Sequence, residues 1–131
     1  VTTLASSVPA IETLVRTYGR DHLCRRVRAA NIPVLSLEQE GSNERELIEA
    51  EIALAISQDA AEAIILGCAG MADLAQHLTQ RFGLPVIDGV SAAVKMVEGL
   101  VSQGLKTSKA GGYVWPPNKM YHGEFAHDQY S

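Results

Sequence analysis

The stretch AIILGCAGM, residues 63–71, decides the fold, because a continuous apolar run ends there in a turn of small residues. An apolar run without alternation predicts a strand that is buried on both faces, as in a parallel sheet. PVIDG (85–89) predicts a second strand of this kind. VTTL (1–4) has the β-branched residues of a strand end, and RVRAANI (26–32) alternates polar and apolar residues as a half-buried strand does.

Segments with a helical spacing of apolar residues separate these strands. The first helix is predicted to begin after Ser7, and Asn43 with Glu46 has the spacing of a capping box ahead of the second. Within the second helix, Arg45 and Glu49 are spaced for an i,i+4 ion pair. Two further helices are expected over MADLAQHLTQRF (71–82) and SAAVKMVEGLVSQG (91–104). Strand and helix alternate, which predicts an α/β fold with a four-stranded parallel sheet flanked by helices.

The composition is that of an ordinary globular domain. The chain has 131 residues, of which 47% are hydrophobic and 20% charged, and its formal net charge is −4. This charge offers no basic face for a phosphate backbone, so we expect no nucleic-acid partner. No apolar run approaches the roughly 20 residues of a membrane span, so we expect no membrane partner. Two cysteines do not make a disulfide framework, which indicates the reducing cytoplasm.

Several polar residues are expected at one edge of the sheet. In open parallel sheets, ligands bind outside the carboxyl ends of the strands. Thr2 and Thr3 end the first strand, Cys68 follows the third, and Asp88 ends the fourth. These side chains should therefore face a common crevice, whereas Cys24 precedes its strand and falls at the opposite edge.

Cys68 has two interpretations. The helix after it is expected to begin near Gly70 or Met71, so its sulfur would lie beside unpaired backbone N–H groups, which favour a thiolate. Gly67 and Gly70 would let a ligand approach the backbone closely. Alternatively, Cys68 is a small buried residue in a tight strand-to-helix turn. The residues alone leave both interpretations open.

The surroundings of Cys68 narrow the chemistry that its thiol would perform. A nucleophile elbow requires glycine two residues earlier, where Leu66 stands, and no histidine is an evident partner. The four histidines lack metal-ligand spacing with either cysteine, so no metal is expected. A thiolate without histidine or metal indicates a general base in proton transfer at carbon.

The neighbouring polar residues also have structural interpretations. At least one of Thr2 and Thr3 is expected to be simply a β-branched strand residue. Asp88 is predicted to cap the following helix together with Ser91 rather than to take part in catalysis. The loop residues Glu38 and Glu40 are expected to be solvated.

Three segments carry a family resemblance. ILGCAGM, GLPVIDGVSAAVKMVEGLV and GLKTSKAGGYVWPPNKMY resemble the C-terminal part of the hydantoin and allantoin racemases, in the aspartate/glutamate racemase superfamily. VTTLASSVPAIETLVRTYG and RRVRAANIPVL fit the same family, so the resemblance covers nearly the whole chain. GCAGM after the VTT strand is specific to the superfamily, and GLKTSK narrows the resemblance to the hydantoin branch.

The resemblance implies two α/β lobes with an active site between them and racemisation without a cofactor. It implies two cysteines, one in each lobe: one thiolate removes the proton next to the ring carbonyl, and the other thiol returns a proton from the opposite face. Cys68 matches the second cysteine of the pair. The residues that match the substrate-binding positions and the backbone around the thiol are Thr2, Thr3, Gly67, Ala69 and Gly70.

The chain departs from the family pattern because the first cysteine belongs to an N-terminal lobe upstream of VTT, and Cys24 lies at the wrong edge to replace it. We therefore expect the chain to begin within a larger protein. Residues 1–105 would form the lobe with the second catalytic cysteine. Residues 106–131 would form a C-terminal arm that packs on the N-terminal lobe. The arm's aromatic residues Trp115, Tyr121 and Phe125 are expected to cover a surface of either this domain or one that is absent.

These features predict a racemase lobe that binds a small-molecule substrate, with the N-terminal lobe and further copies of the chain as partners. Two alternatives stay open. One is a related carbon-acid enzyme of the superfamily, such as an amino-acid racemase, a maleate isomerase or a malonate decarboxylase. The other is a non-catalytic α/β module that keeps the fold without the chemistry.

Overall fold

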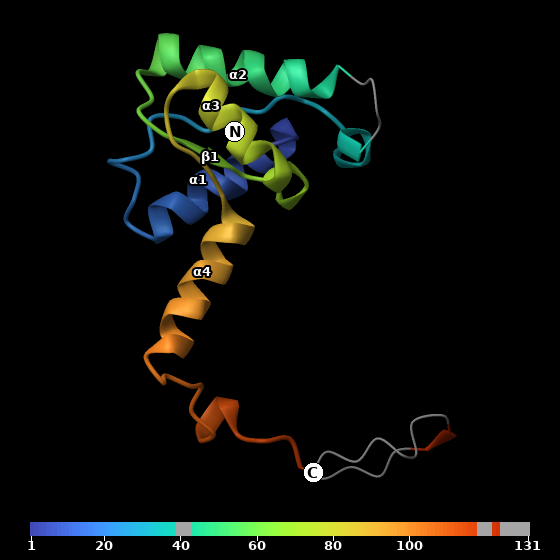
Figure 1. Ribbon diagram of the computed structural model, residues 1–131, viewed down its shortest axis with the longest axis vertical. Coiled ribbons are helices and arrows are strands. Elements are labelled where there is room, and N and C mark those ends of the chain that lie inside the picture. The colour runs from blue at the N-terminus through green and yellow to red at the C-terminus, as the bar shows by residue number, and fades with distance from the viewer. Residues whose placement is uncertain (39–42, 118–121, 124–131) are drawn as a thin grey trace. The chain divides into compact units, whose positions relative to one another are not determined.

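The structure is a computed structural model that describes residues 1–38, 43–117 and 122–123 (Figure 1). It consists of two compact units, residues 1–96 and residues 97–131. Three residues discussed above, Glu40, Tyr121 and Phe125, lie outside the described residues.

The first unit alternates helices with two short strands. Its helices and strands are α1 (Val8–Thr17), α2 (Glu44–Asp59), β1 (Ile64–Leu66), α3 (Ala75–Phe82) and β2 (Val86–Asp88). Three 3-10 turns connect them, η1 (Ala5–Ser7), η2 (Val34–Glu38) and η3 (Ala69–Leu74). Helix α4 (Gly89–Ser102) follows β2 directly.

The two strands form a parallel sheet. Ile64 pairs with Val86 and Leu66 with Asp88. Because the strands are parallel, the residues that follow Leu66 and Asp88 leave the sheet at the same edge. This register therefore brings the segment that contains Cys68 and the start of α4 to one edge, as the sequence predicts.

Two further extended segments lie beside β1. Thr2 and Ala29 form an isolated parallel bridge, and the Thr2 N–H donates to the Arg28 carbonyl over 2.8 Å. On the other side, the Gly67 N–H donates to the Val1 carbonyl over 2.7 Å. The order of the hydrogen-bonded segments is thus 28–32, 1–3, 64–67 and 86–88.

The expected four strands are reduced to two in this α/β fold. Segments 1–4 and 26–32 are joined by three backbone hydrogen bonds around one isolated bridge, which is too short to form a strand pair, whereas β1 and β2 form a regular ladder. Asn31 has a φ of 55°, outside the extended region, and Pro33 has no N–H to donate. The second segment therefore leaves the extended conformation before a longer ladder is built.

The core lies on one face of the sheet. Its fully buried side chains are Ile32, Ile48, Ile52, Met71 and Leu78. The inward-facing strand residues Ile64, Leu66 and Val86 pack in the same cluster. Helices α2 and α3 therefore cover this face (Figure 1).

The other face of the sheet is open, which corrects the expectation that both strands are buried on both faces. Ile65 is 66% exposed and Ile87 44% exposed. Together with Ile11 and Val15 of α1, they line a cavity of about 550 Å³. The prediction from AIILG was wrong because an apolar run shows that a strand is hydrophobic but does not show whether helices cover both faces of its sheet.

The helices begin near their predicted positions, but the predicted caps differ. Ser7 and Asn43 are the N-cap residues of α1 and α2, yet neither side chain makes a capping hydrogen bond. The capping box is therefore wrong. Glu49 does not pair within its helix with Arg45 but with α3, where the Arg81 guanidinium lies 3.1 Å away.

Helix α4 carries an exposed apolar stripe, formed by Val90, Val94, Val97 and Val101 with exposed fractions between 46% and 64%. In the second unit, Gly104 has a φ of 75° just after the helix, and a 3-10 turn, η4, covers Gly111–Tyr113. The Lys109 ammonium lies 4.1 Å from the ring centroid of Trp115, a cation–π contact. Within the described part of the chain, the helices fall short of the length and apolar character that a bilayer span requires.

Candidate active site

Cys68 is the N-cap residue of η3, two residues after the end of β1. Its backbone is extended, with φ −140° and ψ 132°, and its carbonyl accepts a hydrogen bond from the Met71 N–H over 3.1 Å. The side chain is half-buried and is not in a disulfide. The expected helical turn does begin here, but it is of the 3-10 type, and the α-helical part starts only at Ala75. Fewer aligned peptide dipoles therefore face the thiol than the sequence suggested.

Gly67 and Gly70 let other groups come close on either side of Cys68. A Cβ atom on Gly67 would lie 3.3 Å from the Thr2 Cβ and 3.3 Å from the Val1 carbonyl oxygen. Gly67 therefore lets segment 1–3 pass tightly beside the end of β1. A Cβ atom on Gly70 would lie 3.9 Å from the Cys68 Sγ, so the thiol lies over this glycine.

Thr2, which lies against Gly67, and its neighbour Thr3 are both buried, with 2% and 4% exposed. Their backbones are bonded to segment 28–32, with the Ala30 N–H donating to the Thr2 carbonyl and the Ile32 N–H to the Thr3 carbonyl. Among the described residues, neither hydroxyl makes a hydrogen bond to another protein group. These hydroxyl groups are thus unused by the fold, which leaves them available to a ligand.

Asp88 has a structural role, as the sequence predicts. It is 8% exposed, and its Oδ1 accepts a hydrogen bond from the Ser91 N–H over 2.6 Å at the start of α4. This hydrogen bond, with a further one from the Val90 N–H, holds the pKa of Asp88 below its ordinary value. Ser91 itself is not the capping residue, because α4 already begins at Gly89.

The predicted site residues thus fall at one edge of the sheet. Thr2 packs against Gly67, the residue before Cys68, and Ala69 and Gly70 are exposed on the turn that follows. Cys24 lies among residues of another segment, although Gly67 lines the same cavity. It is exposed and lines the cavity on the open face, among the residues that precede segment 28–32.

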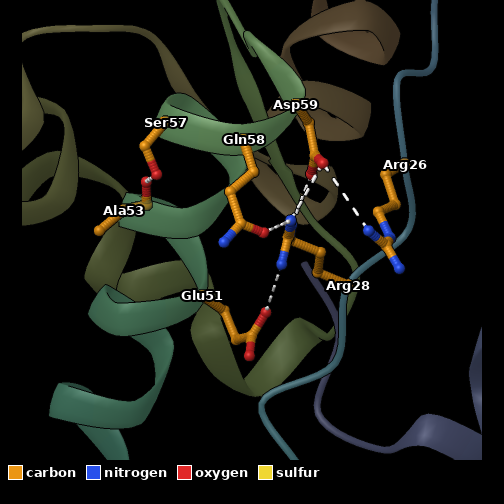
Figure 2. A network of polar contacts seen from close by, with 7 residues as sticks. All are labelled: Arg26, Arg28, Glu51, Ala53, Ser57, Gln58 and Asp59. Carbon is orange, nitrogen blue, oxygen red and sulfur yellow. Dashed lines mark hydrogen bonds and ion pairs between the residues drawn. The ribbon is translucent and has the colours of Figure 1, made fainter.

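A polar network at the other end of segment 28–32 was not predicted from the sequence (Figure 2). The Arg28 guanidinium donates to both carboxylate oxygens of Asp59, to Gln58 Oε1 over 3.0 Å and to Glu51 Oε2 over 3.4 Å. The hydrogen bond to Arg28 lowers the pKa of Asp59, and the same bond raises the pKa of Arg28. Asp59 ends α2, so this network fastens segment 28–32 to that helix.

No spacing rule links Arg28 to Asp59, because they are far apart in the sequence. The sequence does place Arg28 in an alternating segment that is predicted to be half-buried. A buried arginine requires a carboxylate partner, so this position indicates that one exists without identifying it. Within the described residues, no group of three or more His, Cys, Asp or Glu side chains has the arrangement of a metal site.

The chain is similar to known proteins both in sequence and in structure. A family model described as Asp/Glu/Hydantoin racemase matches residues 1–97. A hydantoin racemase of Rhizobium meliloti is 51% identical over 116 residues, which are 88% of this chain and 48% of that protein. A hydantoin racemase of Pseudomonas sp. (strain NS671) is 42% identical over 123 residues, 94% of this chain and 49% of that protein.

Solved structures agree with these sequence relatives. The allantoin racemase from Klebsiella pneumoniae superposes with a TM-score of 0.80 at 44% identity, covering 95% of this chain and 51% of that one. The allantoin racemase from Pseudomonas fluorescens gives a TM-score of 0.75 at 45% identity, covering 93% and 52%. The chain spans about half the length of the curated relatives that it matches. The resemblance noted in the sequence is thereby confirmed.

Proposed function

The chain belongs to the Asp/Glu/hydantoin racemase family, and we propose that it forms one lobe of a cofactor-independent racemase of 5-substituted hydantoins or allantoin. The observation that carries the proposal is the half-buried Cys68 thiol, which lies two residues after the end of β1 at the edge of the sheet where the segment with the two buried threonines also ends. This arrangement offers a base together with hydrogen-bonding groups for a neutral, polar substrate.

The proposed reaction is proton transfer at one carbon. The Cys68 thiolate takes the proton from the ring carbon next to a carbonyl, forming the S–H bond as the C–H bond breaks. The electron pair passes to the carbonyl oxygen, which becomes an enolate. A second thiol, in the lobe that this chain does not contain, returns a proton to the opposite face of the carbon. In the reverse direction the two sulfur atoms exchange roles.

The remaining site residues would hold the substrate during this transfer. The Thr2 and Thr3 hydroxyl groups would bond to the ring carbonyl and N–H groups. The backbone of Gly67, Ala69 and Gly70 would lie against the ring, because two of these residues have no side chain and the third has only a methyl group. Donors aimed at the enolate oxygen stabilise the transition state more than the ground state.

The second lobe would come from the rest of the same protein, with residues 1–105 as this lobe and 106–131 as an arm that packs on the other. Two exposed apolar surfaces support this proposal: the Ile65 and Ile87 face of the sheet, and the stripe on α4. Surfaces of this kind are commonly covered by protein. We further propose the four-stranded, two-lobed arrangement of the superfamily, a homo-oligomer, and a cytoplasmic location that keeps the cysteines reduced.

The test is the substitution Cys68→Ser in the full-length protein. A serine hydroxyl is a far weaker acid than a thiol, so the loss of optical rotation of a single hydantoin or allantoin enantiomer should slow by about 10²- to 10⁴-fold. Cys24→Ser is the matched control and should retain full activity. Undiminished racemisation by Cys68→Ser would remove the basis of the proposal.

A further inference from the structure

Asn31 lies near the end of segment 28–32, at the edge of the sheet that carries the candidate site, and its backbone conformation is unusual. This edge is called the rim. Asn31 is one of two non-glycine residues with a positive φ among the described residues, at 55°. Asparagine tolerates this left-handed conformation better than most residues. The conformation turns the Asn31 side chain toward the neighbouring segment, where its Oδ1 accepts a hydrogen bond from the Ala5 N–H over 3.1 Å.

This hydrogen bond continues the contacts that hold the threonine segment. Segments 1–5 and 28–32 are joined by Thr2 N–H to Arg28 O at 2.8 Å, by Ala30 N–H to Thr2 O at 2.9 Å, and by Ile32 N–H to Thr3 O at 3.0 Å. Beyond Thr3 the backbone ladder stops. The Asn31 amide then provides the next contact, through a side chain instead of the backbone.

The Ala5 N–H requires this partner. Ala5 is the first residue of η1, and the N-cap residue Leu4 has no polar side chain to accept its hydrogen bond. The first N–H groups of a helical turn have no partner within the turn. Asn31 therefore does from a neighbouring segment what a serine or asparagine N-cap does locally.

Resting on the proposed function, we propose that Asn31 is a positioning residue for the racemase site. It does not act on the reacting carbon. Its Oδ1 fixes the turn from Thr3 to Ala5, and thereby the orientation of the Thr2 and Thr3 hydroxyl groups that bind the substrate. Loss of the amide would let this turn loosen at the edge where Cys68 lies, and small misplacements at an active site lower rates strongly.

Three variants of the full-length protein separate this role from a general loss of stability. Asn31→Gly keeps the positive φ but removes the acceptor, and Asn31→Asp keeps an acceptor at the same distance. Ala60→Gly is the matched control, because Ala60 has a φ of 53° at the end of α2, before β1 and so away from the rim.

We expect Asn31→Gly to lower kcat/KM by about tenfold, mainly through a higher KM, because the threonines bind the substrate. Asn31→Asp should restore kcat/KM to within about threefold of the natural protein, and Ala60→Gly should leave it unchanged. Hydrogen exchange of the Ala5 amide, followed by NMR, should be faster in Asn31→Gly and protected in Asn31→Asp.

Two results would overturn the inference. One is a natural KM in Asn31→Gly, and the other is an Asn31→Asp variant as impaired as Asn31→Gly. If the natural full-length protein does not racemise hydantoins or allantoin, the proposed function fails instead. In that case hydrogen exchange of the Ala5 amide still tests whether Asn31 fixes the turn from Thr3 to Ala5. Equal exchange rates in Asn31→Gly and Asn31→Asp would refute this.

Discussion

Asp88 places a carboxylate within the candidate site's edge of the sheet, yet its hydrogen bonds serve the helix that follows. The Ser91 and Val90 N–H groups favour its charged form and lower its pKa. A carboxylate whose pKa is lower in the folded state stabilises the protein above its unfolded pKa of about 3.9. The contribution is lost as the pH falls through the lower, folded pKa.

The first prediction is therefore a loss of stability on acidification. Between pH 7 and pH 5 the contribution of Asp88 should be constant, and it should decline below about pH 4. Asp88→Asn, which cannot ionise, should be less stable than the natural protein at pH 7 and should show a shallower decline in acid. Urea unfolding at a series of pH values measures both slopes, and parallel slopes would contradict the prediction.

The second prediction concerns Gly67, whose neighbours leave little room for a side chain. A Cβ atom there would approach the Thr2 Cβ and the Val1 carbonyl to 3.3 Å, and both belong to a hydrogen-bonded segment that yields little. Gly67→Ala should destabilise the fold by about 1–3 kcal/mol.

Gly89 provides the control for this substitution, since no atom lies within 4 Å of its missing Cβ. Gly89→Ala should be neutral or stabilising by up to about 1 kcal/mol, because alanine favours a helix. Equal effects of the two substitutions in thermal unfolding would show that the crowding at Gly67 is unimportant.

At the scale of elements, α2 ends in an unfavourable conformation. Its C-cap, Ala60, has a φ of 53° and is exposed, and its N–H donates to the Ala55 carbonyl. Glycine adopts this conformation without a Cβ penalty. Ala60→Gly is the third prediction and should stabilise the protein by about 1 kcal/mol in denaturant unfolding. A destabilised variant would mean that the left-handed cap is not formed.

The fourth prediction tests how α2 is fastened to segment 28–32. Arg28 and Asp59 have side chains only 9% and 11% exposed, and the guanidinium contacts both carboxylate oxygens (Figure 2). Arg28→Lys keeps the charge but loses this paired geometry, so the unfolding temperature should fall. Asp59→Asn should then lower the unfolding temperature less in the Arg28→Lys variant than in the natural protein.

Arg26 is the control for this network. Its side chain is 62% exposed and lies 3.9 Å from Asp59, a geometry that contributes little. Arg26→Lys should therefore leave the unfolding temperature unchanged. Additive effects of Arg28→Lys and Asp59→Asn would contradict the assignment of the network.

The sequence predicted the elements better than their partners. Helices after Ser7 and Asn43, the two apolar strands and the capping role of Asp88 were all evident from local spacing and propensity. The side-chain caps at Ser7 and Asn43 were wrong. The Arg45–Glu49 pair and burial on both faces were also wrong, because they depend on segments that are distant in the sequence. Glu49 meets α3, and the outward side chains of β1 and β2 meet an open face.

In the candidate site, too, local features were predicted from the sequence and contacts between distant segments were not. The strand-end rule placed Thr2, Thr3 and Cys68 at one edge, because that rule depends only on strand direction. The position of Asn31 was not predicted, since neither its left-handed backbone nor its hydrogen bond with Ala5 can be recognised in the local sequence pattern.

At the scale of the whole molecule, the stripe on α4 gives the fifth prediction. Val97 is 57% exposed in this chain, so Val97→Glu should change its unfolding free energy by no more than about 0.5 kcal/mol. In the full-length protein, where we propose that the stripe is covered, the same substitution should cost more than about 2 kcal/mol, because a charge would be buried.

Ser102→Glu lies on another side of the same helix and should behave alike in both proteins. Comparing urea unfolding of each variant in the two lengths of chain gives the difference directly. An unchanged effect of Val97→Glu in the full-length protein would show that the stripe stays exposed there.

The order of the hydrogen-bonded segments also bears on how the chain reaches its fold. Segment 1–3 has one partner near residue 28 and the other at β1, and the Val1 nitrogen donates to the Ile65 carbonyl across 64 positions of sequence. Contacts at such a separation slow folding, because a long loop must close before they form. During synthesis, segment 1–3 must therefore remain without its partner β1 until β1, the strand before Cys68, has emerged from the ribosome.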